Sequence, residues 1–180
     1  MYQVGDKVVY PHHGAGTVVK KEKREVLGEQ REYLTIQILH NDMTVQVPSE
    51  NCDKVGLRRV IGDKEIAPVL KALTGISTEM PKNWNRRFKH NRDKMKTGDI
   101  LELAEVVRNL ALRDREKGLS TGEKQMFVKA KKILASELMY AKGMDEETCA
   151  DWLEEVLASD GPAPKKKAAP KKKAAAAATA

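Results

Sequence analysis

The spacing of the hydrophobic residues changes once along this chain, at Gly62. Before Gly62, apolar and polar residues alternate with period two, the pattern of strands with one buried face. After it, apolar residues recur every three to four positions, the pattern of amphipathic helices. A chain of 180 residues has room for two small domains. The sequence therefore predicts an α+β protein, with a β domain over residues 1–61 and a helical domain over 62–159.

Five short antiparallel strands are expected in the β domain. Turns rich in Pro, Gly, Asn and Asp separate them, and Pro48 ends the fourth strand because proline cannot donate a ladder hydrogen bond. Five strands in about 60 residues indicate a small twisted sheet or a partly open barrel. The expected strands are Val4–Tyr10, Gly16–Lys21, Glu32–Leu39, Met43–Val47 and Leu57–Ile61.

Four or five helices are expected after Gly62, and together they predict a compact bundle. Capping residues mark several of their ends, including the capping-box spacing of Ser120 and Glu123. The expected helices are bounded by Asp63 and Gly75, by Asn83 and Gly98, by Ile100 and Gly118, by Ser120 at the start of the fourth, and by Asp145 at the start of the fifth.

Positive charge is concentrated in two segments of the chain. The net charge is +7, but residues 82–96 alone hold seven Lys/Arg and one acid, while residues 161–180 hold six Lys and no acid. A local basic patch beside an aromatic residue is typical of a site for a phosphate backbone. The second segment is a Lys/Ala/Pro run, so residues 160–180 are expected to be a disordered tail. Such a tail either binds polyanions loosely or only solubilises the chain.

Trp84 lies within the first basic segment and has two possible roles. It follows the candidate cap Asn83, which places it in the exposed first turn of a helix, between Lys82 and the pair Arg86-Arg87. A large apolar side chain framed by cations suits insertion at a base step while the cations hold phosphates. The other role is that of an ordinary core residue, and the residues by themselves leave both open.

No motif in the chain predicts catalysis. Gly-rich phosphate loops, a nucleophile elbow and zinc-ligand spacing are all missing from the sequence. His12 and His13 are adjacent, so on a strand they point to opposite faces, and the segment is interpreted as a turn. Cys52 and Cys149 are far apart and are expected to be reduced, buried thiols. We expect a non-enzymatic protein that needs no cofactor and no metal.

The location of the protein is inferred from hydropathy. No apolar run approaches the ~20 residues that a bilayer requires, and the first residues enter a strand pattern directly rather than a signal peptide. A cytoplasmic protein without membrane contact is expected. We also expect it to be a monomer.

The strand Met43–Val47 is expected to lie at an edge of the sheet, because Pro48 ends it. An edge strand offers unpaired N–H and C=O groups that the sheet of another protein can complete. Most edge strands are only protected edges, so partner binding and simple protection both remain open for this strand.

Several segments resemble the CarD/CdnL family of bacterial transcription regulators, which bind RNA polymerase. The resemblance covers about residues 2 to 158; its N-terminal part alone is less specific, because transcription-repair coupling factors carry a similar module. The Trp-Asn-Arg-Arg segment and the helices after it decide between the two. The segments are Val4–Gly14, Gly28–Leu34, Asn83–Arg87, Ala104–Leu110 and Leu119–Lys124.

The resemblance implies a Tudor-like N-terminal domain that docks on the polymerase β subunit by extending its sheet. It also implies a helical domain that contacts promoter DNA at the upstream edge of the transcription bubble and stabilises the open complex, with Trp84 wedged into the minor groove. The implied DNA-binding residues are Trp84, Arg86, Arg87, Lys89 and Lys124. The implied polymerase-binding residues are Arg24, Met43, Thr44, Val45, Gln46 and Val47.

This chain departs from the family pattern in two places. Gln46 stands where some relatives have arginine, and the Lys/Ala/Pro tail lies outside the pattern. The alternative function is that of a nucleoid-type architectural protein, which would coat DNA without polymerase. That alternative leaves the neutral β domain without a role. A metal-dependent hydrolase using His12 and His13 is a more remote alternative.

Overall fold

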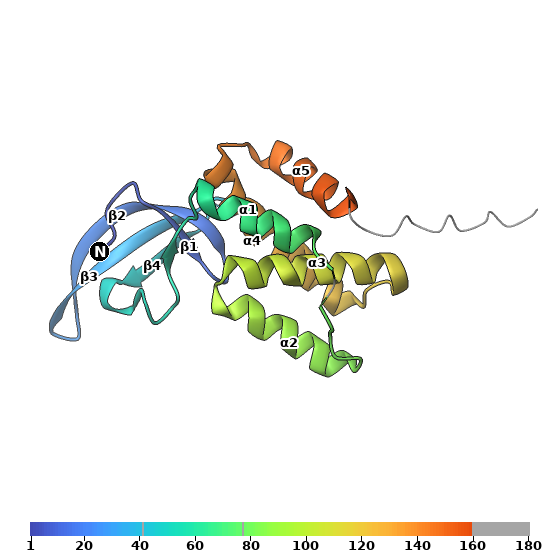
Figure 1. Cartoon of the computed structure of the whole chain (residues 1–180). Coiled ribbons are helices and arrows are strands. Elements are labelled where there is room, and N and C mark those ends of the chain that lie inside the picture. The colour runs from blue at the N-terminus through green and yellow to red at the C-terminus, as the bar shows by residue number, and fades with distance from the viewer. Residues whose placement is uncertain (41, 77, 160–180) are drawn as a thin grey trace, which may run out of the picture.

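The computed structural model describes residues 1–40, 42–76 and 78–159, which form a five-stranded antiparallel sheet followed by five helices (Figure 1). The predicted fold class is thereby confirmed. The strands are β1 (Lys7–Tyr10), β2 (Gly14–Val26), β3 (Glu29–Ile38), β4 (Thr44–Pro48) and β5 (Arg58–Arg59), with the 3-10 helix η1 (Ser49–Asn51) after β4. The helices are α1 (Asp63–Thr74), α2 (Trp84–Thr97), α3 (Ile100–Lys117), α4 (Thr121–Lys142) and α5 (Glu146–Ser159). The tail predicted over residues 160–180 lies outside the described residues.

The sheet has the strand order β4-β3-β2-β1-β5, so β4 forms one edge, as predicted, and β5 forms the other. Its core consists of aliphatic side chains that the alternating pattern directs to one face. This buried cluster contains Val8, Val18, Leu34, Ile36, Ile38, Val47, Cys52 and Leu57.

The β2–β3 hairpin is longer than the sequence predicted. Pairing continues to Val26 opposite Glu29, and the two-residue turn has positive φ at both positions, 55° at Leu27 and 82° at Gly28. Such a turn matches the twist of the strands that it joins. The outer half of the hairpin was missed because it carries charged side chains, which interact along and across the strands rather than alternate in hydrophobicity.

Three boundaries also differ from the predictions. β4 includes Pro48, which is tolerated because the strand is at an edge. β5 is only two residues long, since the Leu57 amide donates to the Cys52 carbonyl in a turn, at 2.9 Å. The N-cap of α1 is Gly62 rather than Asp63, and the Gly62 amide donates to the Glu65 carboxylate at 2.8 Å.

The other predicted caps are where the sequence indicated. Asn83 caps α2 by accepting from the Arg86 amide, and Ser120 and Glu123 form a capping box on α4. Gly98 ends α2 with φ +75°, the left-handed conformation that favours glycine. Asp145 accepts from the amide and the hydroxyl of Thr148 and begins α5.

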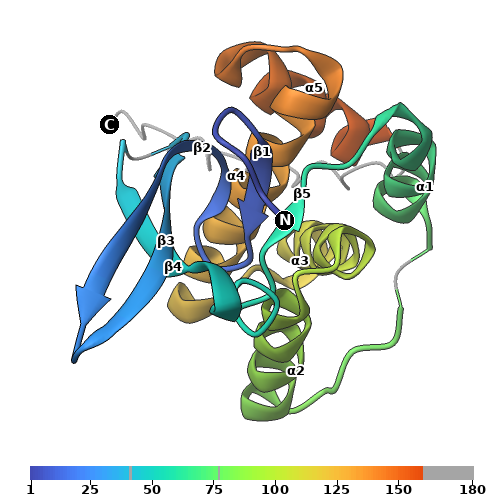
Figure 2. The ribbon, with the colours of Figure 1, turned by 90° about the vertical axis from the view of Figure 1, so that its left-hand side faces the viewer.

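Helix α4 is at the centre of the molecule, in contact with the sheet as well as with the other helices (Figure 2). Leu134 and Leu138 are fully buried in the helical core, while Ser136 lies against β2, where its hydroxyl accepts from the Ala15 amide at 2.9 Å. Helix α4 therefore packs against the sheet on one side and against the other helices on another. Within the described ranges, no helix is long and apolar enough to cross a membrane.

Candidate nucleic-acid interface

Trp84 is the first residue of α2, and its side chain is held at the surface. The ring is stacked on Phe88 with centroids 5.4 Å apart, and its Nε1 donates to the Ser120 hydroxyl at 2.8 Å. Even so, 44% of the residue remains exposed. Stacking and the hydrogen bond restrict the rotamers of the ring, so little conformational entropy remains to be lost when its free face meets a ligand. The core alternative for Trp84 does not fit this placement.

Arg87, which the resemblance placed among the DNA contacts, is buried in this structure. Its Nε donates to the Glu123 carboxylate at 2.6 Å, and its Nη1 donates to the backbone carbonyl of Lys82 at 3.0 Å. Only 3% of Arg87 is exposed, and 1% of Glu123. The guanidinium is therefore not available to a phosphate; it anchors the start of α2 on the start of α4.

The electrostatics of Glu123 agree with that role. Burial alone would raise the pKa of its carboxyl, but hydrogen bonds from Arg87 and from Ser120 outweigh burial, and the pKa lies below its ordinary value. The same Ser120 hydroxyl accepts from Trp84. The buried Arg87–Glu123 ion pair and the Ser120 cap thus hold Trp84 in its exposed position.

Arg86 and Lys89, two of the implied DNA-binding residues, are exposed on α2. Neither forms an ion pair with any residue that the structure describes. Lys94, by contrast, is bound to Glu105 of α3 at 2.7 Å. The basic helix therefore divides into exposed cations without an acidic partner among the described residues and cations that pair within the bundle.

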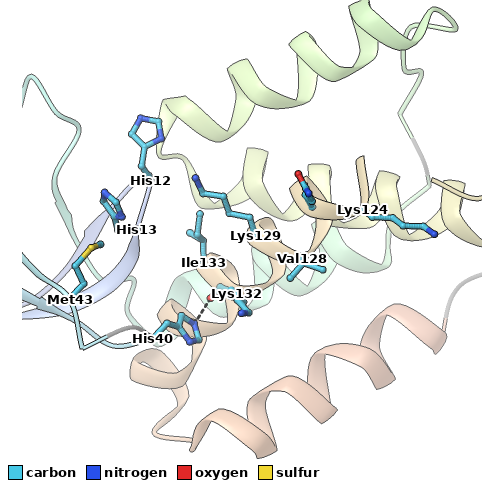
Figure 3. A pocket seen from close by; sticks show the side chains of 10 residues that line it. His12, His13, His40, Met43, Lys124, Val128, Lys129, Lys132 and Ile133 are labelled. Atoms are coloured by element: carbon cyan, nitrogen blue, oxygen red, sulfur yellow. Dashed lines mark hydrogen bonds between the residues drawn. The ribbon is translucent and has the colours of Figure 1, made fainter. Parts of the chain in front are cut away.

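Lys124 lies in the first turns of α4 and lines a groove of about 660 Å³ between α4 and the sheet domain (Figure 3). His12 and His13 form the opposite wall, and Lys129 lies between them and Lys124 in this view. The sequence singled out Lys124 but missed the lysines that follow it, because helical spacing brings them together only along one face of α4.

The two histidines belong to the turn after β1, as interpreted from the sequence. The His13 amide donates to the Tyr10 carbonyl at 2.9 Å, and the centroids of the His13 and Tyr10 rings are 5.2 Å apart. No group of three or more possible metal ligands occurs among the residues that the structure describes.

The predicted polymerase-binding residues lie on or next to the edge strand β4, except Arg24, which is on β2. Arg24 on β2 reaches across β3 and donates to the Gln46 side chain on β4 at 3.1 Å. Arg24 also pairs with Glu22, and its side chain is 47% exposed. Gln46 and Thr44 are exposed, Met43 and Val45 are half-buried, and Val47 is buried in the sheet core. Val47 therefore offers a partner only its backbone.

A joint between the two domains was not apparent from the sequence. Glu137 of α4 is fully buried and accepts two hydrogen bonds from the Arg58 guanidinium, with Nη2–Oε2 at 2.7 Å, and a third from the Ile61 amide at 3.1 Å. Arg58 also donates through Nε to the Gly98 carbonyl at the end of α2, at 2.7 Å. We call these four residues the domain joint.

Comparisons with known proteins place both domains in one family. Residues 2–61 match the family model "CarD-like/TRCF RID domain", and residues 68–154 match "CarD, C-terminal domain". The chain is 37% identical over 147 residues to the Bacillus subtilis protein named "Putative transcription factor YdeB", covering 82% of this chain and 96% of that one. The chain belongs to the CarD family.

The resemblance seen in the sequence is thus confirmed. CarD-family transcription factors are a non-enzymatic family, in agreement with the lack of catalytic motifs. One solved structure, the N-terminal domain of Myxococcus xanthus CarD, is 30% identical, covers 33% of this chain and 79% of that chain, and superposes with a TM-score of 0.30.

Proposed function

We propose that this CarD-family transcription factor binds the RNA polymerase β subunit through the β4 edge and stabilises the open promoter complex through α2. In this proposal the sheet domain chooses the position, and the helical domain contacts DNA at the upstream edge of the bubble. The observation that carries the proposal is the Trp84 ring, anchored through Ser120 with one face exposed among free cations.

The polymerase part of the proposal has two supports. Residues 2–61 match a domain type named for polymerase interaction and shared with coupling factors. Of the two edges of the sheet, β5 is tied to α4 through Arg58, so β4 is the edge with room for an added strand. Backbone pairing at such an edge provides affinity with little dependence on side chains.

The DNA part follows from linkage. A protein that contacts melted DNA better than duplex shifts the equilibrium toward the open complex by that difference in affinity and by no more. Stacking on one base contributes about 1–3 kcal/mol, a factor of roughly 5–150 in the equilibrium. Arg86, Lys89 and Lys124 supply attraction to phosphates, whereas Arg87 supplies rigidity.

The test replaces Trp84. Trp84→Ala should shorten the lifetime of open complexes by about fivefold or more, measured after challenge with a competitor, while polymerase binding in a pull-down stays near the wild-type level. Trp84→Phe, which keeps an aromatic ring, should give an open-complex lifetime between those of the wild type and Trp84→Ala. An unchanged lifetime in Trp84→Ala would rule out the wedge, and failure of the wild-type protein to co-purify with core polymerase would favour the architectural alternative.

A further inference from the structure

The groove that contains Lys124 continues into a second groove of about 300 Å³ beside α2. His12, Gln125 and Lys129 line both, so the two grooves adjoin along α4. Phe88 and Arg92 of α2 line the second groove. They are four and eight residues after Trp84, so they lie on the same face of α2 as Trp84. A continuous channel leads from beside the tryptophan to the sheet domain.

The charge along this channel has one sign. The cations that line it are Arg92, Lys96, Lys124, Lys129 and Lys132, and neither lining includes a carboxylate. None of these five forms an ion pair with the described part of the chain, although Lys131, on another side of α4, is bound to Glu154 at 2.5 Å. What sets the channel apart is that its cations line adjoining grooves whose walls hold no carboxylate.

We propose that this channel is a track for the phosphate backbone of duplex DNA, running from the Trp84 end of α2 across the domain boundary to His12 and His13. The proposal rests on the proposed function and adds a path for the DNA, with contacts from the sheet domain. From Lys124 to Lys132 the helix rises about 12 Å, which corresponds to roughly three base steps of one strand. Apolar walls at Phe88, Met95 and Val128 suit the sugars between phosphates.

His13 makes the track sensitive to pH in this proposal. His13 faces Lys129 and His12, and its pKa lies below the ordinary value of 6.5. Burial of the ring is the largest cause, followed by the charge of Lys129 and by His12. The third histidine of the groove, His40, has both ring nitrogens engaged, by Glu146 at 2.9 Å and by the Lys132 carbonyl at 2.7 Å. A phosphate entering beside His13 would favour its protonated form. Binding would then take up protons and strengthen as the pH falls.

A first experiment measures the salt dependence of duplex binding by fluorescence anisotropy with the full chain. The double variant Lys129→Gln/Lys132→Gln should bind more weakly and reduce the slope of log K against log salt by about 2, one unit for each lost phosphate contact. The matched control is Lys64→Gln/Lys71→Gln, which removes the same charge from exposed lysines of α1 and should leave the slope unchanged. All proteins keep the same tail, so its contribution cancels.

A second experiment follows duplex affinity from pH 7.5 to about 6, the range in which histidine titrates. The wild-type protein and His90→Gln, altered at an exposed histidine of α2, should both gain affinity as the pH falls. His13→Gln should lose most of that gain. An equal gain in all three would overturn the role of the turn.

Failure of the track can be told from failure of the proposed function by including Trp84→Ala on forked DNA. If Trp84→Ala weakens binding while Lys129→Gln/Lys132→Gln keeps the wild-type slope, the track is wrong and the wedge stands. If the lysine variant keeps the slope but loses affinity for polymerase, the channel faces an acidic protein surface instead. If the wild-type protein binds neither duplex nor fork, both proposals fall.

Discussion

Arg87 shows how much the role of one residue depends on burial. It lies beside Arg86 in the most basic segment of the chain, yet it is buried against Glu123 while Arg86 is exposed. Removing one partner of a buried ion pair leaves an uncompensated charge, which costs about 3–5 kcal/mol. We therefore expect Arg87→Met to lower the free energy of unfolding in urea by about that amount.

Arg86→Met is the matched control for this prediction. It removes the same charge from the neighbouring exposed position, where surface substitutions usually stay within about 0.5 kcal/mol. Arg86→Met should instead weaken DNA binding. Equal stability of the two variants would show that the ion pair to Glu123 does not support the fold.

At the scale of elements, the end of α2 is fitted against the turn after β1. Gly98 has φ +75°, and a Cβ added there would lie 3.0 Å from the Pro11 side chain; at Gly143, the end of α4, φ is +63° and the space is open. Left-handed backbone costs a non-glycine residue about 1–2 kcal/mol. Gly98→Ala should lower the melting temperature more than Gly143→Ala does, and the difference measures the Pro11 contact.

Equal losses in the two glycine variants would mean that the turn moves aside freely. In that case α2 would not be held in place by the sheet domain at its C-terminal end.

The sheet edge gives a second prediction at this scale. Arg24 and Gln46 are joined on the exposed surface beside β4. Arg24→Glu should weaken binding to core polymerase in a pull-down without unfolding the sheet, because it replaces a surface ion pair with Glu22 by two like charges, a change that costs little stability at the surface. Lys23→Glu, the same charge reversal at the adjacent position of β2 and hence on its opposite face, should bind normally. Full binding by Arg24→Glu would exclude this surface.

At the scale of the whole molecule, the domain joint sets the distance between the two proposed binding surfaces. Glu137 holds Arg58 and the Ile61 amide, and Arg58 holds the end of α2. In Glu137→Ala these donors lose a fully buried acceptor, at a cost of about 3–5 kcal/mol. We expect calorimetry to show two separate unfolding transitions, and open-complex lifetime to fall even where DNA and polymerase affinities are each retained.

Glu154→Ala provides the control at this scale. It breaks the exposed ion pair to Lys131, which contributes about 0–1 kcal/mol, and should leave one cooperative transition. A single transition in Glu137→Ala as well would show that packing between α4 and β2, rather than the joint, couples the domains.

Hydrophobic spacing and caps were enough to predict the order of elements, the caps Asn83 and Ser120, and the edge position of β4, because these depend on neighbours within a few residues. The long β2–β3 hairpin was underestimated, since its outer half is polar on both faces. The sequence also placed Trp84 in an exposed first turn, and its resemblance to a family implied that this residue inserts into the minor groove.

Only the tertiary structure separated Arg87 from Arg86 and brought Arg58 to Glu137, residues 79 positions apart. The sequence lists charges, but their solvent exposure depends on which elements meet around them. The same reason explains the channel: its lysines come from α4, its histidines from the turn after β1, and Arg92 from α2. Local sequence determined what each segment became, whereas packing decided which charges were neutralised inside and which remained for a partner.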